Sequence, residues 1–416
     1  MRIEIIKSAA PRPLANYSEC FKFGPWVFAA GQIASDYKTG VAPEARRKPA
    51  FPYYGSDIKL QTHYILGNLK KTFEAAGSSL DHVVKAQVFM TDLDNFTAFD
   101  EVWREYFRVP PARTTVGTTG LLVPGTLVEI DLIGYAPGQG IEHKAIKSAA
   151  PTPLANYTEG FAVGNMIFAA GQLASDYKTG VPAEAKRDPA FPYYGSDIKK
   201  QTRYILNNLK STFEAAGGSL DEVVKAQIFM TDLNNFNGFD EVWKEFFKVP
   251  PARTTIGTSG LLVPGTLVEI DLIGLRGNGP KREAITSTNP KPLANYTEAF
   301  RAGDLVFAAG QIASDFSTGI APEAQVDPAF PYYGSSIKKQ TRYILSNLKN
   351  TFEAAGSSVD HVVKAQVFLT DLNDFYAFDE VWKEFFKTPP PRSTVGTPGL
   401  LVDGCRIEID LIGVVA

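Results

Sequence analysis

The chain has 416 residues, of which 44% are hydrophobic and 21% are charged, a composition typical of globular proteins with two to four domains at this length. The formal net charge of −3 argues against the overall basic surface that nucleic acids or anionic membranes require. The sequence has no apolar run of about 18 residues and no signal peptide near its N-terminus, so we expect a cytoplasmic protein that binds a small molecule.

The segment PLANY occurs three times along the chain, with its tyrosine at Tyr17, Tyr157 and Tyr296, at intervals of 140 and 139 residues. Solenoid repeats are shorter, at about 20–50 residues, so each copy is long enough to fold as a domain. Segments 135–144 and 275–283 are rich in glycine, proline and charge, as linkers are. We therefore predict three domains, at residues 1–136, 143–276 and 282–416.

The elements of the first copy can be read in chain order. RIEII and WVFAAGQ are typical of strands, and apolar residues that recur on one face predict a helix from Asp57 to Gly77. VVKAQVFMTDL predicts a central strand, and a second amphipathic helix follows Asn95 and ends before Pro110. TTVGT and LVEIDLIG predict the last two strands.

The order ββαβαββ predicts an α+β domain in which two helices cover one face of a sheet. Alternation along VEIDLI puts Val128, Ile130 and Leu132 on one face and Glu129 and Asp131 on the other. The face of the sheet away from the helices must also be buried or hydrated. We therefore predict that the three sheets pack inward around a common axis with their helices outside, so that a monomeric chain forms an intramolecular trimer.

An arginine follows a proline-rich turn at the start of a strand in each copy, and a threonine lies two residues later on the same face. The arginines are Arg113, Arg253 and Arg392, and the threonines are Thr115, Thr255 and Thr394. A guanidinium group is always charged and its planar fork suits a carboxylate. An ion pair with Glu129 or Asp131 that only ties two strands together is an equally good interpretation.

A glutamate stands 16 residues after each arginine, at Glu129, Glu269 and Glu408. A carboxylate on an inward face is costly unless it is paired or hydrated. Such a group can act as a general acid or base on a water molecule. A simple ion-pair role on a polar strand face is equally consistent with the sequence.

Tyrosines form a third recurring set. Tyr17, Tyr157 and Tyr296 each follow an asparagine in a loop, where a phenol can bind a ligand, although a single tyrosine is more often a packing residue. A long loop before the first helix of each copy carries the segment AFPYYGS, with the tyrosine pairs Tyr53 and Tyr54, Tyr193 and Tyr194, and Tyr332 and Tyr333. Long loops are either functional or disordered, and adjacent aromatic residues argue against disorder.

Metal ligands and histidine bases are not supported by the pattern. The four histidines do not recur at equivalent positions in all three copies, which excludes a histidine site used in every copy. Cys20 and Cys405 lie in different parts of their repeats and form neither a disulfide framework nor a metal site. We predict no metal.

The ordered set FAAGQ, VVKAQVFMTDL, PPARTTV and LVEIDLIG, present three times with small variations, resembles the RidA/YjgF family of reactive intermediate deaminases. The resemblance implies a chorismate-mutase-like fold that assembles as a trimer with ligand sites in clefts between subunits. It also implies hydrolysis of 2-imino or 2-enamino acids to 2-oxo acids and ammonia, without metal or organic cofactor. The chain looks like such a trimer written as one polypeptide.

Carried over by motif, the resemblance assigns binding of the substrate carboxylate to the three arginines, placement of the hydrolytic water to the three glutamates, and lining of the pocket to Tyr17, Tyr157 and Tyr296. The glycines of the FAAGQ segment, Gly31, Gly171 and Gly310, and the three threonines would contribute to substrate binding.

Two positions depart from the pattern of well-studied family members. Alanine precedes each motif glycine where serine is frequent, and threonine stands where cysteine is frequent. Together with the tyrosine pairs, these changes suggest a larger or more aromatic substrate, such as an aminomuconate-like enamine. Another hydrolase or lyase activity on the same scaffold, or a metabolite-binding protein without catalysis, are the alternatives.

Overall fold

The computed structural model describes residues 2–138 and 141–415. The parts of the domain and linker predictions that concern Met1, Gln139, Gly140 and Ala416 lie outside the described residues. Among the helices of the described residues, none is both long enough and apolar enough to cross a membrane.

Each repeat folds into one seven-stranded sheet with two α-helices. In repeat 1 the elements are β1 (Ile3–Ile6), β2 (Cys20–Phe23), β3 (Trp26–Ala29), β4 (Gln32–Ile33), α1 (Asp57–Ala75), β5 (Val83–Met90), α2 (Phe96–Tyr106), β6 (Ala112–Gly117) and β7 (Val128–Tyr135). The strand order is β1-β2-β3-β7-β5-β6, and β4 pairs with β7. Only β5 and β6 are parallel; the other neighbours are antiparallel.

Repeats 2 and 3 have the same topology. The elements of repeat 2 are β8 (His143–Ile146), β9 (Gly160–Val163), β10 (Met166–Ala169), β11 (Gln172–Leu173), α3 (Asp197–Ala215), β12 (Gly218–Met230), α4 (Phe236–Phe246), β13 (Ala252–Gly257) and β14 (Val268–Arg276). Those of repeat 3 are β15 (Arg282–Ile285), β16 (Ala299–Ala302), β17 (Leu305–Ala308), β18 (Gln311–Ile312), α5 (Ser336–Ala354), β19 (Val362–Leu369), α6 (Phe375–Phe385), β20 (Arg392–Gly396) and β21 (Ile407–Val414).

The α+β class is confirmed, but the predicted order ββαβαββ lacks two strands. β2 has only four residues and forms a hairpin with β3 around Gly24, whose φ of 55° suits a tight turn. β4 has two residues and is separated from β3 by Ala30 and Gly31. Both strands are too short to produce a recognisable alternation, and tertiary pairing defines them.

The predicted helices and strand faces are present. α1 begins at Asp57, and Gly77, with a φ of 73°, follows its end. Val128, Ile130 and Leu132 pack in the core beneath the helices, whereas Glu129 and Asp131 are buried on the opposite face. The side chains of β7 therefore alternate between the helical core and the interior of the molecule.

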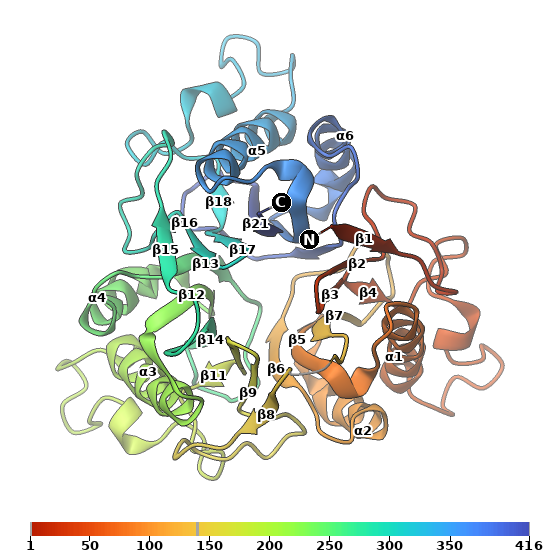
Figure 1. The fold of residues 1–416 in the computed structure, drawn as a ribbon, viewed down its shortest axis with the longest axis horizontal. Helices are drawn as coiled ribbons and strands as arrows, with labels where there is room; N and C mark the ends of the chain where they lie inside the picture. The colour runs from red at the N-terminus through yellow and green to blue at the C-terminus, as the bar shows by residue number, and fades with distance from the viewer. Residues whose placement is uncertain (1, 139–140, 416) are drawn as a thin grey trace.

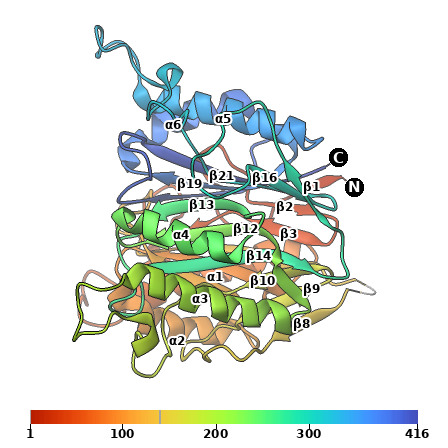
Figure 2. The same ribbon diagram turned by 90° about the vertical axis from the view of Figure 1, so that its left-hand side faces the viewer.

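The three sheets surround a common axis, and the α-helices of the described residues, α1 to α6, lie on the outside (Figure 1). A second view shows the sheets stacked against one another in the interior, with α5 and α6 on the upper surface (Figure 2). On the axis, the ring of Phe89 lies 6.4 Å from that of Phe229 and 6.3 Å from that of Phe368. The chain is thus a pseudo-trimer with an apolar centre shared by all three repeats.

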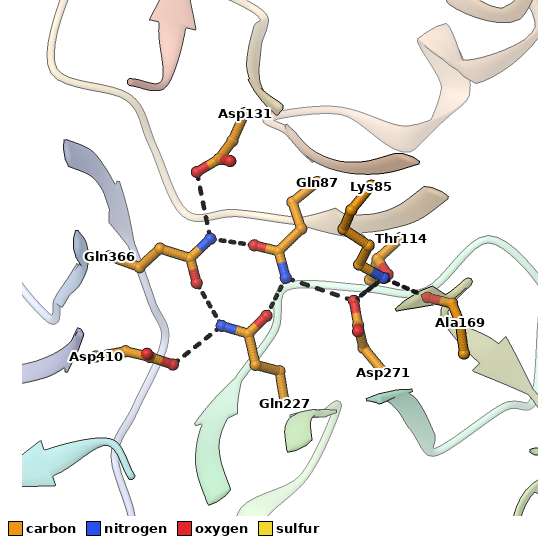
Figure 3. A network of polar contacts seen from close by, with 9 residues as sticks. All are labelled: Lys85, Gln87, Thr114, Asp131, Ala169, Gln227, Asp271, Gln366 and Asp410. Carbon is orange, nitrogen blue, oxygen red and sulfur yellow. Dashed lines mark hydrogen bonds and ion pairs between the residues drawn. The ribbon is translucent and has the colours of Figure 1, made fainter. Parts of the chain in front are cut away.

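A polar layer also lies on the axis (Figure 3). Gln87 donates a hydrogen bond to Gln227, Gln227 donates to Gln366, and Gln366 donates back to Gln87. Each repeat contributes one glutamine, so the ring closes only when all three repeats are in place. A buried amide network of this kind favours one arrangement, because its groups lose their partners in any other.

Buried ion pairs join each repeat to the next around this ring. The Lys85 ammonium of repeat 1 lies 2.5 Å from Asp271 of repeat 2, and both side chains are 3% exposed. The same lysine donates to the backbone carbonyl of Ala169 at 2.6 Å. The equivalent pairs are Lys225 with Asp410 and Lys364 with Asp131. The third pair joins repeat 3 to repeat 1, so the three ion pairs link the repeats into a closed ring.

Candidate functional site

A cleft of about 600 Å³ lies between repeats 1 and 2. Repeat 1 contributes Arg113 and Thr115 from β6, and repeat 2 contributes Tyr157, Gly171 and Glu269. The arginine in this cleft therefore meets the tyrosine, glycine and glutamate of the next repeat, and not those of its own.

Backbone hydrogen bonds between repeats fix this arrangement. The Gly171 N–H donates to the Arg113 carbonyl at 3.2 Å, and the Thr158 N–H donates to the Pro111 carbonyl at 3.3 Å. Equivalent bonds run from Gly310 to Arg253 and from Gly31 to Arg392. The equivalent residues come together at the other two junctions between repeats, and we call all three places clefts: the first, whose volume is given above, has Arg113, Tyr157 and Glu269; the second has Arg253, Tyr296 and Glu408; the third has Arg392, Tyr17 and Glu129.

The guanidinium of Arg113 is held by an acid on a helix. Asp100 of α2 lies 2.8 Å from it, and Asn156 of the PLANY segment donates to Asp100. The interpretation that Arg113 pairs with Glu129 or Asp131 of its own repeat is wrong. Glu129 lies in the third cleft, and Asp131 forms an ion pair with Lys364. The equivalent partners of Arg253 and Arg392 are Asp240 and Asp379.

Aromatic rings surround the rest of the guanidinium. The rings of Phe96, Phe99, Trp103 and Tyr157 have centroids between 5.0 and 5.7 Å from the Arg113 guanidinium carbon. Burial lowers the pKa of Arg113, and the charge of Asp100 opposes this effect. Within the described residues, Nη1 of Arg113 makes no hydrogen bond. The cleft thus holds a buried cation with an unused donor, the arrangement that a ligand carboxylate would satisfy.

Glu269 lies in the same cleft, and its burial raises its pKa to about 8. The neighbouring charge of Asp271 raises this pKa further, whereas the charges of Lys85 and Arg113 and the Thr115 backbone N–H lower it. The same physical causes raise the pKa of Glu129 and Glu408 to about 8. Each glutamate is therefore mostly protonated at neutral pH, and Oε2 of Glu269 has no hydrogen-bond partner among the described residues.

The motif glycines leave space for these carboxyl groups. A Cβ at Gly171 would lie 2.1 Å from Oε1 of Glu269, and equivalent contacts exist between Gly31 and Glu129 and between Gly310 and Glu408. The glycine is needed because the carboxyl group occupies the place of a side chain. The close approach of the glutamate carboxyl group, and not the backbone conformation, is what requires glycine at these three positions.

Replacing Gly171 with alanine should therefore displace the Glu269 carboxyl group from the first cleft. The added Cβ would also lie 2.9 Å from the Thr114 side chain, so we expect ligand affinity to fall in that cleft alone, by about tenfold, with a stability loss of about 1–3 kcal/mol from overpacking. Calorimetric titration with a 2-oxo acid and urea unfolding would measure both quantities. The control is Gly67→Ala in α1, where a Cβ meets nothing within 4 Å; equal effects of both substitutions would contradict this account.

In two of the three clefts, the hydroxyl of a second tyrosine is hydrogen-bonded to the hydroxyl of the cleft tyrosine. The Tyr157 hydroxyl donates to that of Tyr177 at 2.8 Å, and the hydroxyls of Tyr17 and Tyr37 lie 2.9 Å apart. Burial raises the pKa of Tyr157 and Tyr17 well above the ordinary value. These residues are therefore neutral phenols; because the Tyr157 O–H is used on Tyr177, Tyr157 can accept a hydrogen bond from a ligand and Tyr177 can donate one.

The tyrosine pairs of the AFPYYGS loops do not lie in the first cleft. Their side chains are 78% to 95% exposed, and none of them is among the residues that line the cleft. Figure 2 shows the loop before α5 extending away from the body of the molecule. Within the corresponding loop of repeat 1, the Tyr54 N–H donates to the Phe51 carbonyl and forms a local turn. The expectation that these pairs bring aromatic rings to the substrate is therefore wrong for this conformation.

Sequence reasoning missed the acid beside each arginine, the asparagine that binds it and the second tyrosine. One signal was available for the acid: Asp100 belongs to the segment FDEVW, which is identical in all three copies, and it lies on the buried face of α2. A charged residue among Phe99, Val102 and Trp103 needs a partner, and a buried cation is the usual one.

Comparisons with known proteins match each of the three repeats separately. The family model described as Endoribonuclease L-PSP matches residues 7–136, 147–275 and 286–415. A RutC family protein of Pyrococcus horikoshii is 38% identical over 136 residues, which cover 32% of this chain and 98% of that protein. The 2-iminobutanoate/2-iminopropanoate deaminase of Dermatophagoides farinae is 35% identical over 137 residues, covering 33% of this chain and 98% of the enzyme. One relative therefore corresponds to one repeat.

Among solved structures, the crystal structure of a chorismatase matches 80% of this chain and 93% of its own with a TM-score of 0.52. The sequences are 12% identical, so the match concerns the fold alone. It spans more than one repeat, which supports the arrangement of successive repeats as well as the fold of each.

Proposed function

The chain belongs to the Endoribonuclease L-PSP family, as the RidA/YjgF resemblance of its motifs predicts, and on this basis we propose that it is a deaminase. The substrate would be a 2-imino or 2-enamino acid, and the products a 2-oxo acid and ammonia. The reaction would take place in the clefts between successive repeats. The observation that carries the proposal is the pairing, in one cleft, of a buried arginine with a free donor and a buried glutamate whose pKa is about 8.

The arginine would bind and orient the substrate carboxylate. In the first cleft, the free Nη1 of Arg113 would donate to a carboxylate oxygen, while Asp100 holds the other side of the guanidinium. Binding of this kind places the imine carbon at a fixed distance from the glutamate, and positioning contributes much of the acceleration in reactions that need no nucleophilic side chain.

The glutamate would move the protons. Neutral Glu269 donates its proton to the imine nitrogen, which makes carbon 2 more electrophilic. The carboxylate formed in this step then accepts a proton from water as the water oxygen bonds to carbon 2. In the resulting carbinolamine, Glu269 protonates the nitrogen again, the C–N bond breaks, and the hydroxyl proton returns to the carboxylate. Ammonia and the 2-oxo acid leave, and Glu269 is neutral again.

Relatives and cleft size support the substrate class. One relative carries the name 2-iminobutanoate/2-iminopropanoate deaminase, and the volume of about 600 Å³ leaves room for side chains larger than those two substrates have. The outward direction of the tyrosine pairs removes the reason for proposing an aromatic substrate. We do not propose RNA cleavage, because the net charge is −3 and no histidine recurs in all three copies.

The proposal predicts a characteristic pH dependence. Below pH 8 the glutamates hold the proton that the imine nitrogen needs, and above pH 8 they lose it, so kcat/KM, which reports the free enzyme, should fall on the alkaline side with an apparent pKa of about 8. The assay would measure ammonia release from 2-iminobutanoate that an amino-acid oxidase generates in the same vessel.

The matched variant replaces Glu129, Glu269 and Glu408 with glutamine. Glutamine keeps the size of the side chain and a hydrogen-bond donor but transfers no proton. We therefore expect kcat/KM of this variant to be about 10²- to 10⁴-fold lower than that of the unmodified chain and to show no further decrease near pH 8. Ligand binding with no ammonia release by the unmodified chain would favour the non-catalytic alternative. Wild-type rates in the triple glutamine variant would exclude the glutamates as proton donors.

A further inference from the structure

The three clefts share their arginine, tyrosine and glutamate but differ in the second tyrosine. Tyr177 binds the hydroxyl of Tyr157 in the first cleft, and Tyr37 does so for Tyr17 in the third. The second cleft has Phe316 at this position. Among the residues that the structure describes, Tyr296 therefore has no phenol partner, although burial raises its pKa as in the other two repeats.

The backbone at this position is the same in all three repeats. Tyr37, Tyr177 and Phe316 have φ angles of 56°, 57° and 59°, and they are the non-glycine residues with positive φ among the described residues. In each repeat the backbone N–H of the residue donates to a serine hydroxyl at 2.9 Å, which stabilises a conformation that side chains usually avoid. Each ring is thus presented in the same way, and the hydroxyl is the main difference.

A charge at the rim of the cleft differs in the same repeat. Lys178, which lines the first cleft, follows Tyr177, and Lys38 follows Tyr37 in the third. Ser317 stands at this position in the second cleft. One wall of the second cleft therefore lacks a hydroxyl and a cation that the other two clefts have, and both differences lie at the adjacent residues Phe316 and Ser317 of repeat 3.

We infer that the clefts are specialised: the first and third take substrates whose side chain ends in an anionic group, and the second takes substrates with an apolar side chain. This inference rests on the proposed function. The lysine at the rim attracts the carboxylate at the end of the substrate side chain, and the tyrosine pair offers polar contacts to the rest of that side chain. The phenyl ring of Phe316 gives the second cleft an apolar wall, and binding a charged group beside it costs desolvation without compensation.

Fusion of the repeats makes this specialisation possible. In a trimer of identical chains, any substitution appears in all three clefts, whereas here Phe316 and Ser317 change only the second. The residues before this wall are kept, since Ser314 and Asp315 form the same turn as Ser35 and Asp36. Repeat 3 thus keeps the turn and changes only the groups that it presents.

Calorimetric titration of the full chain with two 2-oxo acids, as product analogues, tests the inference. With 2-oxoglutarate, whose side chain ends in a carboxylate, we expect two sites of equal affinity and a third that is about three- to tenfold weaker. With 2-oxobutanoate, which has an apolar side chain, we expect the second cleft to bind at least as well as the other two.

Paired variants assign the weak site. Phe316→Tyr with Ser317→Lys should give three equal sites for 2-oxoglutarate, whereas the matched Tyr177→Phe with Lys178→Ser in the first cleft should leave one strong site and two weak ones. Three equal sites in the unmodified chain, or no change in either variant, would overturn the specialisation while leaving the proposed deaminase intact. Failure of both oxo acids to bind would remove the proposed function and this inference together.

Discussion

Replacing Arg113, Arg253 and Arg392 together with alanine should reduce kcat/KM for 2-iminobutanoate by on the order of 10²- to 10³-fold, the usual effect of losing a buried charged donor at a reacting group. Each substitution removes the cation that faces the cleft and leaves Asp100 or its counterpart unpaired. Ammonia release measured at several substrate concentrations would give the size of the loss.

Folding has to be monitored in that experiment, because a buried acid without its partner destabilises the protein. A second triple variant with lysine keeps the positive charge but lacks the planar fork, so it should remain folded and still lose most of its activity. The control set is Lys70, Lys210 and Lys349→Ala, three exposed residues of helical ion pairs, which should change the rate by less than about twofold. A folded arginine variant with full activity would exclude the arginines as the carboxylate site.

Replacing Lys85 with methionine should lower the free energy of unfolding by about 3–5 kcal/mol, because Asp271 would remain buried without its counterion. The substitution also removes the hydrogen bond from Lys85 to Ala169 in the next repeat. Urea unfolding at neutral pH would measure the change, with Lys70→Met as a control for a lysine that is 59% exposed.

Adding Asp271→Asn to Lys85→Met should recover part of the loss, because an amide is less costly to bury than an unpaired carboxylate. If Lys85→Met changed the unfolding free energy by less than about 1 kcal/mol, the buried pairs would not be what joins the repeats.

The sequence allowed the fold class, the helices and the polar inward face to be predicted because these follow from local patterns. The alternation of VEIDLI placed Glu129 and Asp131 on the side away from the helices, and both are there. The short strand β2 was missed because four residues after a polar loop show no periodicity of their own, and its pairing with β3 defines it.

The partners of the site residues could not be predicted, because they lie in different repeats. Arg113 and Glu269 are more than a hundred residues apart, and their proximity depends on how two sheets pack. The sequence shows which residue types recur, but it does not show whether each set is completed within a repeat or between repeats. The exposed tyrosine pairs illustrate a related limit, since their recurrence says nothing of the direction in which their loop points.

Each cleft combines the arginine of one repeat with the glutamate of the next. Two double variants with equivalent substitutions separate this arrangement from sites contained within single repeats. Arg113→Ala with Glu269→Gln alters one cleft twice, whereas Arg113→Ala with Glu129→Gln alters the first and the third cleft once each.

The rate of ammonia release per chain, at saturating 2-iminobutanoate, separates the two arrangements, because a cleft without its arginine or its proton-donating glutamate contributes little to turnover. The structure predicts two working clefts, and about two thirds of the unmodified rate, in the Arg113→Ala, Glu269→Gln variant, and one working cleft, and about one third of the rate, in the Arg113→Ala, Glu129→Gln variant, because distant clefts act independently. The reverse result, about one third in the first variant and two thirds in the second, would mean that each repeat contains a complete site and would contradict this arrangement.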